Sequence, residues 1–282
     1  MKRKQERTAY LFLLPSLLGT VVFVLFPFLD VIRRSFLQAT GSGFVGLDNY
    51  REVFQNEAFQ RAVCNTGRFL LFCIPLLLLL SFVLAVWIYH LPWGKKTVES
   101  IFLIPMAIPV ASIVVFWKLT FHENGGLNEI LEFFGMQGKD WMNMDAAFGV
   151  LVFTYIWKNL GYDIVLWIAG LAAISSEQYE AAKTDGASRF QSFFYLTLPQ
   201  MRTSFVMIGV LSFIHAFRVF REAYLIAGDY PHESIYMLQH LFNNWFVKLD
   251  MQKMSAAAVL MIVCIGCLLF AVEWWNERED KA

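Results

Sequence analysis

The segment from Leu171 to Arg202, LAAISSEQYEAAKTDGASRFQSFFYLTLPQMR, is a polar stretch between two long apolar stretches. Ser175 followed by Gln178 fits an N-terminal capping box, in which each side chain bonds the backbone N–H of the other residue. Residues 177–183 have helix-forming composition. Gly186 can end this helix, because glycine adopts the left-handed conformation without steric cost. The segment therefore predicts a helix that stops at a glycine hinge.

A second short helix is predicted over residues 188–196, with phenylalanines gathered on one face. Pro199 can begin the next element, because proline is favoured in the first turn of a helix. Two helical patterns joined at a glycine predict a folded connection that docks on another surface.

The composition of the chain is that of a membrane protein. It has 282 residues, 57% of them hydrophobic and 16% charged, and a mean hydropathy of +0.51. A soluble domain is usually about half apolar and a quarter charged. The apolar excess lies in blocks of about 20 residues, enough to cross a bilayer as helix. The net charge of zero implies no bulk attraction to nucleic acid.

We predict an all-α membrane protein with six transmembrane helices, at residues 10–32, 68–89, 100–120, 147–170, 203–226 and 255–275. The first apolar run could imitate a signal peptide, but it is longer than a typical one, and a retained span is expected. Lysine and arginine are more frequent in the segments that would share a side with both termini. This bias predicts an N-in, C-in topology. Residues 1–9 and 276–282 are then cytoplasmic ends, and 10–275 form the transmembrane domain.

No catalytic or metal site is predicted. Gly94-Lys95-Lys96-Thr97 resembles the end of a Walker A motif. The motif requires glycine at position 89 and Ser or Thr at position 96, where this chain has tyrosine and lysine. Cys264 and Cys267 have the spacing of a redox or metal pair. A thiolate would be poorly solvated in an apolar helix, so packing is the favoured interpretation. The chain is expected to bind no cofactor and to catalyse no reaction.

The quoted segment carries a specific resemblance. The residues Glu180-Ala181-Ala182, Asp185-Gly186-Ala187, Phe193 and Leu198-Pro199 resemble the EAA motif of the permease subunits of binding-protein-dependent ABC importers. The variant is similar to the carbohydrate-uptake class, which includes maltose, multiple-sugar and glycerol-phosphate permeases. Ser175 and Thr203 stand where many relatives carry proline.

A second stretch extends the resemblance to essentially the whole chain. Residues 45–50, VGLDNY, then Phe59 and Asn65-Thr66, are similar to an external segment that leads into the second span of these permeases.

The resemblance implies an importer permease core with a cytoplasmic coupling loop at 171–202, between spans four and five. Glu180 would pair with a basic residue in a cleft of an ATPase subunit, and Gly186 would give the turn between the two coupling helices. The implied partners are a second permease subunit in a heterodimer, an ABC ATPase homodimer that binds ATP and Mg, an extracytoplasmic solute-binding protein and membrane lipid. No nucleic acid is implied. The location would be the bacterial plasma membrane.

Polar residues inside the spans indicate a solute pathway, because such residues usually face a cavity or a partner. The fourth span holds Lys158, Tyr162 and Asp163. Lys158 and Tyr162 are four apart and share a helix face. The resemblance places Tyr162 where maltose-type permeases stack a sugar ring; the alternative is that Tyr162 packs or lies at the interface.

The fifth span contributes Ser212, His215 and Arg218, which align with cavity-lining positions of the family. Two basic residues there suit an anionic solute, since arginine binds such groups bidentately. The alternative is that Arg218 and Arg221 reach to the outer interface or pair with Glu222 and Asp229. A carrier or channel independent of ATP is the competing class of function, but it leaves the folded loop unexplained. An intramembrane enzyme would need Lys158 and Asp163 as a pair, and five residues of separation make them diverge.

Overall fold

Helices make up the ordered structure of this chain. The computed structural model describes residues 12–39, 41, 43–217, 223–224, 228 and 230–279. Within these ranges no β-strand is present, and the sole bridge joins Leu37 to Phe44. After a helical start at residues 12–20, the elements are η1 Val21–Leu25, α2 Phe26–Arg34, α3 Asp48–Gln55, α4 Glu57–Tyr89, α5 Lys95–Ala107, α6 Val110–Phe121, α7 Gly126–Phe133, α8 Ala146–Ala172, α9 Ser176–Thr184, α10 Arg189–Ser192, η2 Phe193–Thr197, α11 Leu198–Gln200, α12 Arg202–Ala216, η4 Glu233–Ile235, α14 Leu238–Val247 and α15 Met251–Glu279.

In the described part of the chain, three helices are long and apolar enough to cross a membrane: Phe12–Arg34, Glu57–Tyr89 and Met251–Trp274. Two bent pairs raise the number to as many as five. They are Lys95–Ala107 with Val110–Phe133, bent by 89°, and Ala146–Ala172 with Ser176–Thr184, bent by 62°. The fifth expected span begins as α12, a shorter apolar helix of 15 residues. Most of its predicted end, residues 218–222 and 225–226, lies outside the described part of the chain.

The prediction of one continuous span over residues 100–120 is wrong. The chain leaves the helical conformation at Ile108 (φ −76°, ψ 131°) and Pro109 (φ −55°, ψ 136°), between α5 and α6. Proline disfavours the helical conformation in the residue before it, because its ring crowds that residue's backbone. The third hydrophobic block is therefore a broken helix.

Two other prolines widen a helix without breaking it. The wide π-type segments η1 and η2 end at Leu25 and Thr197, two residues before Pro27 and Pro199. A proline ring clashes with the carbonyl four residues earlier and cannot donate to it. A locally wider turn relieves this clash, so the helix continues through the proline. Pro199 lies in the first turn of the short helix α11, as predicted, and the following span begins at Arg202.

The chain divides into two compact units. The first comprises residues up to Gln60 together with Leu241–Trp274. In it the side chain of Asn49 donates to the carbonyl oxygens of Ser35 and Leu37, each at 2.9 Å. The Ser35 hydroxyl lies 2.7 Å from the hydroxyl of Tyr50. These bonds fasten α3 to the end of the first span, which gives residues 45–50 a structural role.

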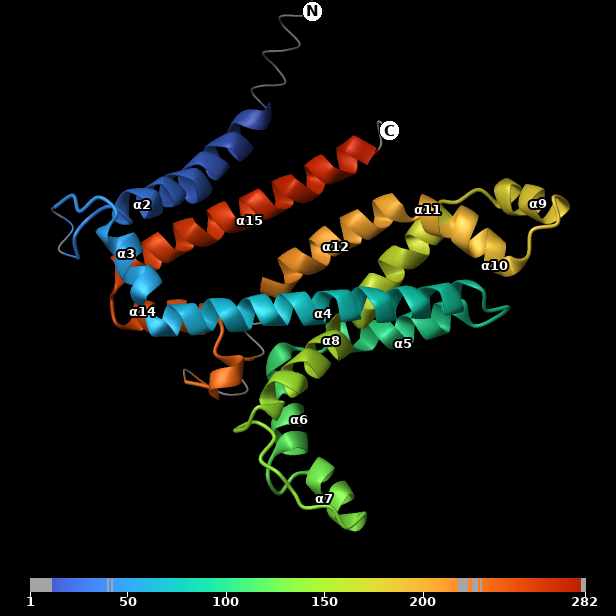
Figure 1. The fold of residues 1–282 in the computed structure, drawn as a ribbon, viewed down its shortest axis with the longest axis horizontal. Coiled ribbons are helices and arrows are strands. Elements are labelled where there is room, and N and C mark those ends of the chain that lie inside the picture. Colours follow the sequence, from blue (N-terminus) through green and yellow to red (C-terminus); the bar gives the residue numbers. More distant parts are fainter. Residues whose placement is uncertain are drawn as a thin grey trace, which may run out of the picture. The chain divides into compact units, whose positions relative to one another are not determined.

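The second unit contains residues 61–240 and both predicted sites. Helices α5 and α12 each pack against α8 in it, side chains of α4 join the same core, and α9 and α10 extend beyond the end of α8 (Figure 1). Its core includes Trp167 of α8, which is fully buried and donates from Nε1 to the hydroxyl of Ser81 on α4 at 2.8 Å. Phe82 and Phe205 pack against the same indole, with ring centroids 5.1 and 4.4 Å away.

Candidate functional site: the two-helix loop and the α8–α12 contact

The first loop helix, α9, has an N-terminus that differs from the predicted one. The Ser175 hydroxyl accepts from the backbone N–H of Glu177 at 3.2 Å, so the cap is present. The predicted box with Gln178 is wrong, because the Gln178 side chain accepts a hydrogen bond from Gln200 on α11 instead. A partner 22 residues away has replaced the local one.

The end of α9 explains the glycine of the motif. Gly186 has φ +81°, as predicted for a left-handed stop. The N–H of Ala187 donates to the carbonyl of Ala182 at 2.9 Å, and that of Gly186 donates to Lys183 at 3.1 Å. These two bonds form a Schellman motif, which satisfies carbonyls at the end of a helix. Alanines at 182 and 187 keep the two bonded residues small.

The second loop helix carries the capping box that sequence reasoning missed. The N–H of Gln191 donates to the Ser188 hydroxyl at 3.2 Å, and the N–H of Ser188 donates to the Gln191 side chain at 2.8 Å. Ser-x-x-Gln is the recognisable signal for this cap. The helix then runs through α10, η2 and α11, which confirms the predicted helix at 188–196 and extends it to Gln200.

One side of this second helix is anchored and the other is exposed. Phe193 packs against Phe82 of α4 with ring centroids 6.2 Å apart, and the Thr197 hydroxyl lies 2.8 Å from that of Tyr179. Phe190 and Tyr195 are 72% and 83% exposed. Aromatic side chains so exposed on a firmly held helix form a surface suited to a protein partner.

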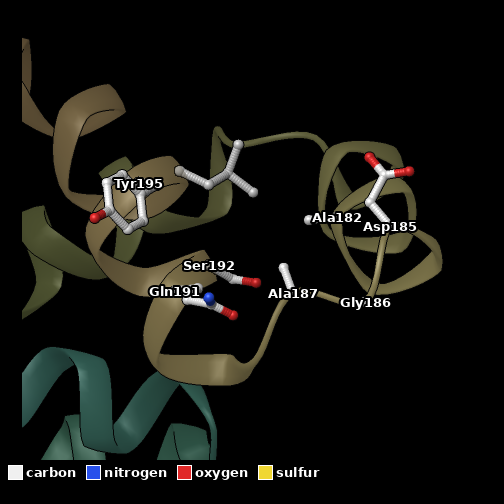
Figure 2. A pocket seen from close by; sticks show the side chains of 8 residues that line it. Ala182, Asp185, Gly186, Ala187, Gln191, Ser192 and Tyr195 are labelled. Atoms are coloured by element: carbon white, nitrogen blue, oxygen red, sulfur yellow. The ribbon is translucent and has the colours of Figure 1, made fainter.

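A concavity of about 360 Å³ lies between the two loop helices. Figure 2 shows Ala182 and Asp185 on one side of it, and Ser192 and Tyr195 on the other, with Gly186 in the turn. Glu180 is exposed near this surface, and among the described residues its carboxylate has no ion pair. The sequence-predicted loop residues are thus gathered on one hinged, two-helix projection.

The second predicted site forms where α8 meets α12. Asp163 is 1% exposed, and its carboxylate accepts a hydrogen bond from Ser212 at 2.9 Å. Beside this bond the rings of Tyr162 and His215 lie 5.3 Å apart, inclined by 47°. Four of the six predicted pathway residues therefore meet across the two helices. Lys158 is half-buried one turn earlier on α8.

Arg218 lies outside the described residues, so the expectation about its role stays a prediction. Neither binding of an anionic solute by Arg218 nor its placement at the outer interface is tested by the described residues.

The buried carboxylate of Asp163 makes the Ser212 hydroxyl important for stability. Ser212→Ala would leave a buried acceptor without this donor, at a cost of about 1–3 kcal/mol. Asp163→Asn should cost less, because the serine can still donate to the amide oxygen. Thermal unfolding of the purified variants checks this order. Equal stability of Ser212→Ala and the parent protein would contradict the buried hydrogen bond.

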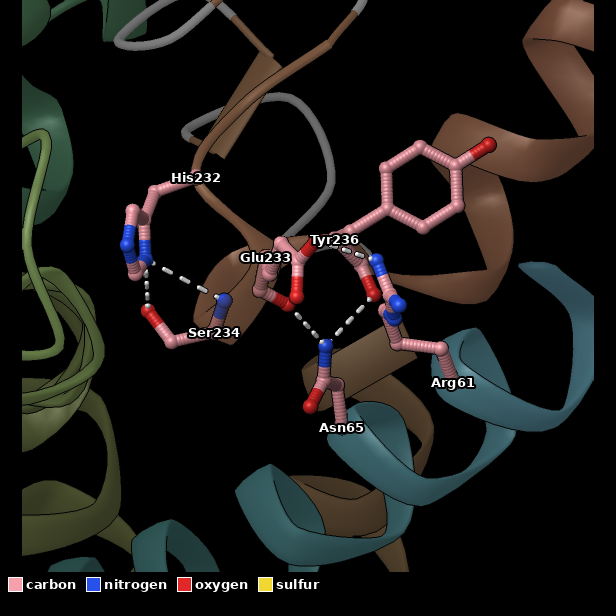
Figure 3. A network of polar contacts seen from close by, with 6 residues as sticks. All are labelled: Arg61, Asn65, His232, Glu233, Ser234 and Tyr236. Atoms are coloured by element: carbon pink, nitrogen blue, oxygen red, sulfur yellow. Dashed lines mark hydrogen bonds and ion pairs between the residues drawn. The ribbon is translucent and has the colours of Figure 1, made fainter. Parts of the chain in front are cut away.

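Two positions with a clear structural role were not recognised as sites from the sequence. Gly161 lies where α5 crosses α8, and a Cβ atom there would be 2.0 Å from the carbonyl oxygen of Phe102. Asn65 on α4 donates to the carbonyls of Glu233 and Tyr236 at 2.6 and 3.0 Å, and Arg61 pairs with Glu233 at 2.7 Å (Figure 3). The second half of the external motif therefore holds the connection that precedes α14.

An all-helical membrane protein with a hinged two-helix projection and polar residues between its spans has the features of a transport permease. Residues 71–281 match the family described as binding-protein-dependent transport system inner membrane component, and the chain belongs to this family. It is thus an integral inner-membrane protein and a permease subunit of an ABC importer.

Individual relatives align with this chain over nearly its full length. The chain is 29% identical to the trehalose/maltose transport system permease protein MalF of Thermococcus litoralis, covering 94% of this chain and 92% of that protein. It is 30% identical to the sulfoquinovosyl glycerol transport system permease protein SmoG of Agrobacterium fabrum, over 92% and 87%. A bacterial alginate ABC transporter, solved with a periplasmic protein that holds an alginate pentasaccharide, has the same fold. Its TM-score is 0.80 at 21% identity, over 97% and 94% of the two chains.

Proposed function

We propose that this chain forms half of the translocation pathway for a sugar or sugar-like solute. Its membrane domain, residues 10–275, would hold six spans with both termini in the cytoplasm. The solute class is supported by the names of its relatives, which transport trehalose and maltose or sulfoquinovosyl glycerol. An external binding protein would deliver the solute; in support, the alginate transporter was solved in complex with a periplasmic protein that holds an alginate pentasaccharide.

The two-helix loop is the observation that carries the proposal. It presents exposed aromatic rings and a concavity on a projection anchored to α4 by Phe193. We assign it to a cleft on a separate ABC ATPase homodimer, which binds ATP and Mg. Closure of that dimer would move the loop as a lever and switch the spans between two discrete states. A second, different permease subunit would complete the pathway.

Co-purification tests this assembly directly. The tagged chain is extracted from its native membrane in mild detergent, and the proteins that accompany it are identified by mass spectrometry. Recovery of an ATPase, a second permease and a solute-binding protein is expected. Recovery of the folded chain alone, active in liposomes without ATP, would overturn the proposal in favour of a carrier.

The α8–α12 contact is the proposed solute-facing site. Tyr162 offers a flat apolar ring with a polar rim, which suits the face of a pyranose. Tyr162→Ala should reduce uptake by about fivefold, since stacking against a ring contributes about 1 kcal/mol. Tyr162→Phe keeps the ring and is the matched control. Uptake of a radiolabelled solute, identified by ligand screening of the binding protein, measures the difference. Equal uptake by the alanine and phenylalanine variants would exclude stacking.

A further inference from the structure

Helix α7 presents three distinct faces. Leu127, Asn128 and Leu131 turn toward the protein, and Asn128 is 1% exposed. A second stripe of Ile130, Phe133 and the adjoining Phe134 is 58%, 86% and 71% exposed. These three residues follow the i, i+3, i+4 spacing of one helix face.

The third face of α7 is acidic. Glu129 and Glu132 are exposed and three residues apart, so they lie next to each other along the helix. The sequence of α7, GLNEILEF, contains no lysine or arginine. An exposed apolar stripe beside an exposed acidic stripe is the pattern of a helix at a boundary between an apolar and an aqueous phase.

Asn128 holds this helix rigidly in place. Its amide nitrogen lies 3.1, 2.8 and 2.8 Å from the carbonyl oxygens of His122, Glu123 and Lys139. Its amide oxygen accepts from the backbone of Lys139 at 3.1 Å and from the Trp141 indole at 2.8 Å. One buried side chain thus connects the segment before α7 to the segment after it.

Local backbone contacts also fix both ends of α7. At Gly125 a Cβ atom would lie 2.3 Å from the carbonyl oxygen of Leu119, so the chain folds tightly against the end of α6. After the helix, Gly135 has φ +76°, and the N–H of Met136 donates to Leu131 at 2.9 Å. The exposed phenylalanines are therefore displayed by a fixed helix and not by a loose loop.

The position of α7 in the chain indicates its depth. It follows α6 after a connection of four residues, and α6 and α7 together form one half of a bent apolar pair. It precedes α8, whose 27 residues are about 40 Å long, and α9 follows the other end of α8. The α7 region and the two-helix loop are therefore joined to opposite ends of a helix that is long enough to cross the bilayer.

Helix α7 packs on its neighbours through its inward face. Trp117 of α6, Trp141 and Trp157 of α8 belong to one apolar cluster that includes Leu127 of α7, and the rings of Trp117 and Trp157 are 5.3 Å apart. The stripe of Ile130, Phe133 and Phe134 does not belong to this cluster and stays exposed.

We propose that α7 is an interfacial anchor, whose stripe of Ile130, Phe133 and Phe134 inserts into the headgroup–acyl boundary of the leaflet opposite the two-helix loop. Glu129 and Glu132 face the water, and α7 itself offers no basic side chain to anionic headgroups. The anchor holds the outer end of the broken α5–α6 span at a constant depth. This inference rests on the membrane location of the chain and not on its solute.

Site-specific photocrosslinking in the intact membrane tests the anchor. Phe133 is replaced by p-benzoylphenylalanine, which keeps an aromatic ring at that position, and the same residue at Glu132 is the matched control. After irradiation, mass spectrometry should find lipid adducts several-fold more abundant at position 133 than at 132. Adducts to the binding protein or another subunit at 133, equal lipid adducts at both positions, or none at 133 would each overturn the proposal.

Lipid composition gives a second measurement. The thermal midpoint of the protein in nanodiscs should fall when Phe133→Gln and Phe134→Gln are combined. It should not fall for Glu129→Gln with Glu132→Gln, and the fall caused by the phenylalanine changes should be of similar size in zwitterionic and anionic lipid. A midpoint insensitive to the phenylalanine changes would contradict an anchoring role.

Discussion

Gly161→Ala is expected to destabilise the protein by about 3 kcal/mol, the upper end of the usual cost of overpacking a core. The added methyl group would lie 2.0 Å from the carbonyl oxygen and 2.4 Å from the carbonyl carbon of Phe102. These are backbone atoms, so no side-chain rotation can make room. Helix α5 would have to move away from α8. The thermal midpoint in detergent and the yield of monodisperse protein measure the effect.

Gly149→Ala on the same helix is the matched control. A Cβ atom at Gly149 would meet no atom within 4 Å. Alanine is the better helix former by about 1 kcal/mol, so this variant should be as stable as the parent or more stable. If both alanine variants behaved alike, the close crossing of α5 and α8 would not limit stability.

Gly186→Val is expected to abolish transport while the membrane domain still folds and inserts. A side chain costs about 1–2 kcal/mol in the left-handed conformation, and β-branching raises this cost. Gly186 has φ +81°, and no atom crowds the position of its missing Cβ. The penalty is thus conformational, and it falls on the hinge between α9 and α10. ATP hydrolysis that continues without solute uptake is the expected signature in reconstituted vesicles.

Gly186→Asn separates conformation from side-chain size. Asparagine enters the left-handed region more readily than other non-glycine residues, so this variant should retain much of the uptake. Normal coupled transport by Gly186→Val would contradict the lever role of the loop. Loss of uptake in both variants together with loss of the ATPase from the complex would indicate failed docking instead of failed coupling.

Local signals in the sequence predicted much of the loop. The glycine stop at Gly186 was read correctly, because a left-handed residue needs no tertiary partner. The Ser188–Gln191 box was equally local and could have been found by the same rule. The box between Ser175 and Gln178 failed for the opposite reason, since Gln200 on α11 provides Gln178 with a competing partner. The break at Pro109 was also readable from the proline itself.

Contacts between distant segments could not be read in the same way. The sequence predicts that Asp163 and Ser212 line a solute pathway, but 49 residues separate them in the chain. Their hydrogen bond is seen only because α8 packs on α12. Asn65 was known only as part of a family-like segment, and its bonds to residues 233 and 236 required the tertiary structure.

The class of this protein can be predicted from its apolar blocks of membrane-spanning length and from the polar loop with its glycine hinge. The length of an apolar segment and the end of a helix depend on residues that are close in the chain, so both can be predicted from the sequence. Which helix faces meet is seen only in the tertiary structure. There Gly161 lies against the Phe102 backbone and the ring of Tyr162 contacts that of His215. Phe133 and Phe134 are exposed. Such outcomes depend on the approach of distant helices, which is governed by side-chain packing in three dimensions.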